Sequence, residues 1–191
     1  MTEPAHEFIT ALRDIMQVIE TDYQGMIIGG VAVIALGYPR LTTDIDSTIL
    51  VSLNALEPLL KKLDTHGIDS RIENTIDFAK SNHVLLMKHR TSGINIDISL
   101  AGLPFEKKAI ADRQFINFAG VRIAIPKVED ILIYKMVASR TKDLRDVEEL
   151  LLRHIDKINL AEVRNVLKQF ATLLERPEII TQLEELIKRV K

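Results

Sequence analysis

The sequence predicts an α+β fold, in which helices and strands alternate up to about residue 125 and only helices follow. Three observations support this prediction. Residues 44–52 alternate apolar and polar side chains, as a half-buried strand does. Apolar segments flank residues 91–93 and again residues 119–120, and each pair is typical of a β-hairpin with a glycine in its turn. After Pro126, apolar residues recur at helical spacing.

Local signals place the individual elements. Gly37 suits the end of a helix, and Ser52 is expected to cap the following one by accepting a backbone hydrogen bond. The first expected segments are a helix at 5–21, a strand at 25–28, a helix from 29 to Gly37, a strand at 44–52 and a helix at 52–66. The later ones are strands at 83–90, 94–100, 115–118 and 121–125, and helices at 127–140, 143–153, 160–175 and 178–190.

Composition excludes several classes of function. The 191 residues hold 25 Lys and Arg against 27 Asp and Glu, a formal net charge of -2. This balance excludes a polybasic nucleic-acid binder, although a local basic groove stays open. There is no cysteine, which excludes disulfide scaffolds, thiolate zinc sites and thiol nucleophiles. The five histidines show no metal-ligand spacing and are expected at the surface or in turns.

No segment predicts export or a membrane partner. The first residues, MTEPAHEF, lack the basic and apolar regions of a signal peptide. The most apolar run, 25–37, is shorter than the roughly 20 residues that a membrane helix needs. We therefore expect a cytoplasmic protein, which the lack of cysteine fits.

The most informative pattern is Asp44-Ile45-Asp46 at the start of an expected strand. Residues two apart on a strand project from the same face, so the two carboxylates point together. Adjacent carboxylates repel each other, and a divalent cation such as Mg²⁺ removes that cost. Alternatively, the pattern simply opens a strand after a turn, with both carboxylates in water.

Two further features lie near this pattern in the expected fold. Gly29 and Gly30 stand between an apolar strand and an apolar helix, where glycines let the backbone approach a phosphate; close helix packing is the alternative. Asp97 interrupts an isoleucine-rich strand. If that strand lies beside the one with Asp44 and Asp46, three carboxylates converge. Otherwise Asp97 belongs to the polar outer face of an edge strand.

In combination, Gly-Gly, Arg-x-Thr-x-Asp-x-Asp and a third Asp in an apolar strand resemble the nucleotidyltransferase superfamily with the DNA polymerase β palm. The segments 125–135 and 140–146 resemble its AbiEii/AbiGii-type toxin and minimal nucleotidyltransferase branch. The resemblance covers roughly 26–150. It implies a small mixed sheet with flanking helices as a palm over residues 1–125, and a helical subdomain over 126–191 packed on it.

The resemblance also implies residue roles. Asp44, Asp46 and Asp97 are expected as catalytic residues and ligands of Mg²⁺ or Mn²⁺, with Asp97 either the third ligand or the base near the acceptor hydroxyl. The expected nucleotide-binding residues are Gly29, Gly30, Arg40, Thr42, Lys135 and Lys142. From the residues alone, Lys135 is equally an interior lysine whose amine reaches the surface. For the charges at 142–146, a solvated and mutually paired helix start is the commoner outcome.

The implied function is metal-dependent transfer of a nucleoside monophosphate from an NTP such as ATP to a hydroxyl. The implied acceptor is tRNA or another RNA end, or a protein side chain, in a toxin–antitoxin or phage-defence system with a cognate antitoxin as partner. A small molecule such as an aminoglycoside is a further acceptor. Two rivals stay open: a non-catalytic nucleotide- or partner-binding antitoxin or regulatory module on the same fold, and a glycosyltransferase that uses Asp-x-Asp.

Overall fold

The computed structural model describes residues 3–191 and confirms the α+β fold. Its elements form two compact units. The first contains the chain up to Val31 together with Leu41–Ile125, and the second contains Ala32–Arg40 together with Pro126–Lys191. The boundary expected after residue 125, with the helical part packed on the palm, stays a prediction.

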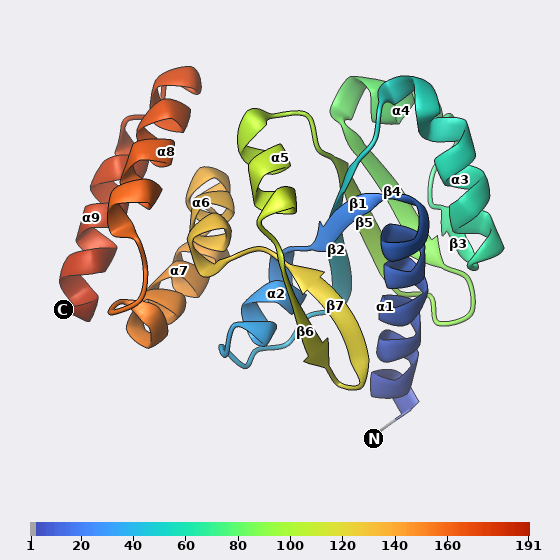
Figure 1. Cartoon of the computed structure of the whole chain (residues 1–191), viewed down its shortest axis with the longest axis horizontal. Coiled ribbons are helices and arrows are strands. Elements are labelled where there is room, and N and C mark those ends of the chain that lie inside the picture. Colours follow the sequence, from blue (N-terminus) through green and yellow to red (C-terminus); the bar gives the residue numbers. More distant parts are fainter. Residues whose placement is uncertain (1–2) are drawn as a thin grey trace. The chain divides into compact units, whose positions relative to one another are not determined.

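A five-stranded mixed sheet forms the centre of the first unit (Figure 1). The strand order is β1-β2-β5-β4-β3, in which β2 and β5 are parallel and the other neighbouring pairs are antiparallel. The strands are β1 (Gln24–Ile27), β2 (Asp44–Leu50), β3 (Ile68–Ser70), β4 (Val84–His89) and β5 (Asn95–Leu100). A separate two-stranded ribbon consists of β6 (Gln114–Phe118) and β7 (Val121–Ile125).

The helices of the first unit cover these strands. Contacts join α1 to β1 and β7, α3 to β3, and α4 to β4 (Figure 1). On α1, Leu12, Ile15 and Ile19 are buried at helical spacing, so one face of the helix joins the core. The helices are α1 (Glu3–Asp22), α3 (Leu56–Thr65), α4 (Thr75–Asn82) and α5 (Pro104–Ala111), and the 3₁₀ turn η1 (Leu53–Ala55) precedes α3.

The alternation of β2 and β5 decides which side chains face the core. Ile45 and Ile49 of β2 are fully buried, as are Ile96 and Ile98 of β5. Because successive side chains on a strand point to opposite faces, Asp44 and Asp46 of β2 and Asp97 of β5 point to the face opposite these isoleucines. The same pattern that builds the sheet therefore leaves one face lined with carboxylates.

The second unit is helical. The helix α2 (Gly29–Ala35) begins in the first unit and ends in the second, which also contains α6 (Val128–Ala138), α7 (Thr141–His154), α8 (Leu160–Leu173) and α9 (Glu178–Val190). Ile131, Leu132 and Ile133 are all buried, and α6 accordingly contacts α7, α8 and α9. Arg153 Nε of α7 donates to the carbonyl oxygen of Gly37 at 2.9 Å, which ties the segment after α2 to α7.

Several local expectations are wrong. Ser52 precedes a 3₁₀ turn and makes no side-chain capping hydrogen bond. β3, α4 and α5 lie in segments to which the sequence pattern assigns no element. His89, expected at the surface or in a turn, is the buried last residue of β4, with 2% of its surface exposed. Among residues 3–191, no helix is both long enough and apolar enough to span a bilayer.

Candidate active site

The register of β2 and β5 brings the three predicted carboxylates to one face of the sheet. Asp46 is the direct cross-strand partner of Asp97, and Asp44 is the partner of Asn95. Directly opposite residues on neighbouring strands share a face, and Asp44 and Asp46 share one because they are two apart. β5 lies between β2 and β4, so the alternative that Asp97 belongs to an edge strand is wrong.

Thr42 orients the first carboxylate. Its Oγ1 donates to Oδ1 of Asp44 at 3.0 Å and approaches the backbone oxygen of Asp44 at 3.2 Å. Thr42 lies in the segment that leads into β2 and is partly buried. The hydroxyl therefore fixes the side chain of Asp44 at the point where the strand begins.

Gly29 lies directly against the second carboxylate. The backbone N–H of Ile28 donates to the carbonyl oxygen of Asp46 at 2.9 Å, so the chain leaving β1 passes beside β2. A Cβ atom at Gly29 would come within 1.9 Å of Oδ2 of Asp46, and φ at Gly29 is +60°. Only glycine combines this backbone conformation with so close an approach. Gly30 follows as a buried residue of the first turn of α2.

Arg71 is a component of the site that the sequence did not predict. It follows β3, and its backbone N–H donates to the carbonyl oxygen of Leu86 at 2.9 Å. Leu86 is in turn the cross-strand partner of Asp97. The Arg71 side chain forms an ion pair with Asp97 through Nη2 and Oδ1. One line of neighbours thus crosses the sheet from Gly29 through Asp46, Asp97 and Leu86 to Arg71.

Neighbouring groups act on the pKa of Asp97 in opposite directions. Burial is the main cause that raises this pKa above its ordinary value. The positive charge of Arg71 lowers the pKa, and the negative charge of Asp44 raises it further. Asp97 is therefore electrostatically linked both to Asp44 on β2 and to Arg71.

The residues fit a divalent cation held by Asp44 and Asp46. Carboxylate oxygens, supplemented by phosphate oxygens and water, are the ligands that Mg²⁺ prefers. Among residues 3–191, no three His, Asp or Glu side chains are grouped so that they could hold a metal ion by themselves. The third predicted ligand, Asp97, is paired with Arg71 instead.

The other predicted nucleotide-binding residues belong to the second compact unit. Nζ of Lys135 lies 3.0 Å from Oδ1 of Asp143 and 2.9 Å from Oδ2 of Asp146. Arg40 also binds Asp146 through two nitrogens, at 3.0 and 3.2 Å. Lys142 is exposed on the first turn of α7. Nucleotide contacts by these three residues stay predictions.

The charged residues at the start of α7 are only partly exposed to water. The alternative that residues 142–146 form a solvated helix start is therefore wrong for part of this cluster. Asp143 is fully buried and Asp146 is 2% exposed. Burial raises the pKa of Asp143, but hydrogen bonds from Arg140 and Lys135 outweigh it, so the pKa lies below its ordinary value. Lys135 is 6% exposed and therefore joins a buried network.

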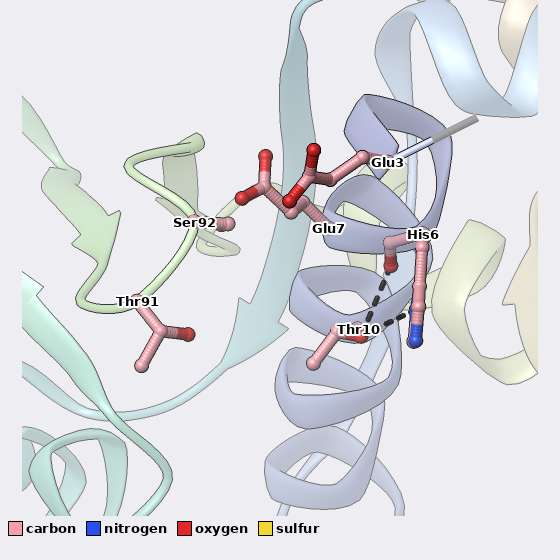
Figure 2. Close-up of a pocket in the computed structure, with 6 residues that line it drawn as sticks. All are labelled: Glu3, His6, Glu7, Thr10, Thr91 and Ser92. Carbon is pink, nitrogen blue, oxygen red and sulfur yellow. Dashed lines mark hydrogen bonds between the residues drawn. The ribbon is translucent and has the colours of Figure 1, made fainter.

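A cavity of about 300 Å³ lies elsewhere in the first unit, between α1 and the β4–β5 turn. Figure 2 shows the carboxylates of Glu3 and Glu7 directed toward the turn that carries Ser92, while the ring of His6 lies beside Thr10. None of the predicted site residues lines this cavity. The ring of buried His89 hydrogen-bonds to Ser92 at 2.7 Å and to Asp14 at 3.0 Å, which links the turn to α1.

The mixed sheet and its carboxylate-lined face define the class of protein, a nucleotidyltransferase fold. The chain belongs to a family described as nucleotidyltransferase of unknown function (DUF6036), whose model matches residues 6–191. No curated protein sequence matches the chain.

Solved structures agree with this fold. The solution structure of the antibiotic-resistance factor ANT(2'')-Ia is 15% identical, with a TM-score of 0.63 over 92% of this chain and 98% of that one. A crystal structure of ANT(2'')-Ia in complex with adenylyl-2''-tobramycin is 15% identical, with a TM-score of 0.53 over 98% and 99%. An antigenic nucleotidyltransferase-like protein from Paracoccidioides brasiliensis is 18% identical, with a TM-score of 0.55 over 92% of each chain.

Proposed function

We propose that the protein transfers a nucleoside monophosphate from an NTP to an acceptor hydroxyl and releases pyrophosphate, with Mg²⁺ or Mn²⁺ held by Asp44 and Asp46. One observation carries the proposal: the register of β2 and β5 puts Asp46 beside Asp97, on the face where Asp44 also lies. A cation bound there supplies charge neutralisation at the transferred phosphoryl group.

The chain's own residues position the reactants in this proposal. Thr42 holds the carboxylate of Asp44 in one orientation. The close contact between Gly29 and Asp46 keeps the backbone at the start of α2 near the carboxylates, where Gly29 and Gly30 cradle the triphosphate. Asp97 provides the third carboxylate, as a ligand or as the base for the acceptor hydroxyl.

The proposal also covers the molecule that carries the acceptor hydroxyl. The predicted acceptors are an RNA end, including tRNA, and a protein hydroxyl, in a toxin–antitoxin or defence system of the AbiEii/AbiGii type with a cognate antitoxin. A small hydroxylated antibiotic is an equally direct candidate, because one similar structure contains an adenylated tobramycin. All three share one chemistry, attack of a hydroxyl oxygen on the α-phosphorus.

Radiolabelled NTPs test the reaction and separate the acceptors. Each NTP, labelled at the α or the γ position, is incubated with Mg²⁺ or Mn²⁺ and with tRNA, lysate protein or tobramycin. Transfer of a monophosphate moves the α label to one acceptor and leaves the γ label in pyrophosphate. D44N and D46N should abolish the transfer, whereas D69N, which changes a partly exposed aspartate on β3 that pairs with Arg90, should not.

Two outcomes would contradict the proposed transfer. An unchanged rate in D44N or D46N would remove the mechanism. No incorporation from any NTP with either cation, together with nucleotide binding that survives D97N, would instead identify the non-catalytic module.

A further inference from the structure

The loop between β3 and α4 holds Arg71 toward the carboxylates. Ser70 Oγ donates to the carbonyl oxygen of Ile72 at 2.8 Å, and Thr75 Oγ1 donates to the same oxygen at 2.9 Å. Asn74 adopts a left-handed conformation with φ of 52°, which turns the chain into α4. The loop is thus fixed by its own hydrogen bonds, and the backbone N–H of Arg71 is fixed by β4.

The ion pair between Arg71 and Asp97 is exposed enough for another cation to replace Arg71 at the carboxylate. The side chains are 26% and 37% exposed, and ion pairs this open to water contribute little to stability. Within residues 3–191, the Asp97 carboxylate is the one side-chain partner of the Arg71 guanidinium. Asp97 is also the third carboxylate that, with Asp44 and Asp46, would complete a three-carboxylate metal site.

We propose that Arg71 is a resident counter-ion of Asp97, which a divalent cation must displace before Asp97 can join Asp44 and Asp46 as a ligand. This inference rests on the proposed function, because it concerns the same cation. When no cation is bound, Arg71 relieves the repulsion among three carboxylates on one face. When a cation binds, Arg71 competes with it for Asp97, so Arg71 sets the affinity of the site and acts as a positioning residue.

Mn²⁺ titration of the free protein by calorimetry tests this without any measurement of activity. R71Q should bind Mn²⁺ on the order of tenfold more tightly than the wild type, which matches the lower end of the effect that one adjacent arginine has on proton binding at a carboxylate. R71K keeps the charge and should stay close to the wild type. R90Q is the matched control, since Arg90 pairs with Asp64 and Asp69, neither of which is a predicted metal ligand, and the Mn²⁺ affinity of this variant should not change.

The double variant separates competition from a general effect. R71Q/D97N should lose the gain in affinity, because the carboxylate that Arg71 occupies is no longer charged. Circular dichroism of each variant confirms that the fold is retained. If Mn²⁺ binding is lost in D44N but R71Q binds the ion as tightly as the wild type or more weakly, the inference is overturned and the proposed function stays intact. Binding that persists in D44N, or no binding even in R71Q, would overturn both.

Discussion

Replacing Gly29 with alanine should disturb both stability and the second carboxylate, because the added methyl group has no room. Its Cβ would lie 1.9 Å from Oδ2 and 2.6 Å from Cβ of Asp46. The substitution also forces alanine into a left-handed backbone conformation, with φ of +60°. The free energy of unfolding is therefore lowered twice, once by the strained backbone and once by the steric clash with Asp46.

Gly67 allows the two costs to be separated. Its φ is +69°, but an added Cβ at this position would meet no atom within 4 Å. G67A should therefore show only the backbone cost, about 1–2 kcal/mol. G29A should lose a further 1–3 kcal/mol, roughly the cost of forcing extra volume into a packed site.

Urea denaturation followed by circular dichroism measures this difference, since the chain has no tryptophan for fluorescence. Calorimetry with Mn²⁺ then reports on the carboxylates: G29A should bind the ion more weakly because Asp46 must move, whereas G67A should bind it normally. If G29A is no less stable than G67A and binds Mn²⁺ equally well, Gly29 does not lie against Asp46 as described.

Three further predictions concern the buried charges and the threonine. K135M removes the cation shared by Asp143 and Asp146 and should lower the free energy of unfolding by about 3–5 kcal/mol in urea denaturation; a loss below 1 kcal/mol would contradict a buried pair. Because the folded state lowers the pKa of Asp143, its ionised form stabilises the protein fully above about pH 5, and this effect is lost as the pH falls from about 4 through the lowered pKa. The stability difference between wild type and D143N should therefore shrink as the pH falls through this range, and a constant difference would refute the assignment. T42V should weaken Mn²⁺ binding because the hydrogen bond to Asp44 is lost, while the free energy of unfolding changes by only about 0.5–1.5 kcal/mol; unchanged affinity would contradict the orienting role.

The carboxylate face was predictable because a two-residue period decides both the core and the polar side of a strand. Ile45 between Asp44 and Asp46, and Ile96 and Ile98 around Asp97, are enough to assign the faces. That β2 and β5 are neighbours was an additional hypothesis, supported by the resemblance, and the sheet order confirms it. The nucleotidyltransferase fold follows from the same residues.

Arg71 could not be predicted because its role depends on tertiary neighbours. β3 has three residues, too few for a periodic pattern, and no pattern in the sequence predicts an element between 67 and 82. Only the register that runs from Arg71 through Leu86 to Asp97 shows that the arginine reaches the site. An arginine next to a short strand carries no such signal on its own.

At the start of α7 the sequence shows a cluster of charges but not which of them are buried. Clusters such as Lys142, Asp143, Arg145 and Asp146 are usually solvated, and sequence alone does not show which members turn inward. The structure buries the two aspartates against Lys135 and leaves Lys142 and Arg145 exposed. Spacing places Asp143 and Asp146 on one face of the helix, but only packing determines that this face is covered.

A crystal structure of the protein with Mn²⁺ and a non-hydrolysable NTP would locate the metal through its anomalous signal. We expect a peak between the carboxylates of Asp44 and Asp46, with the triphosphate beside Gly29. A nucleotide bound without a metal at these two aspartates, or a metal bound only elsewhere on the protein, would contradict this expectation.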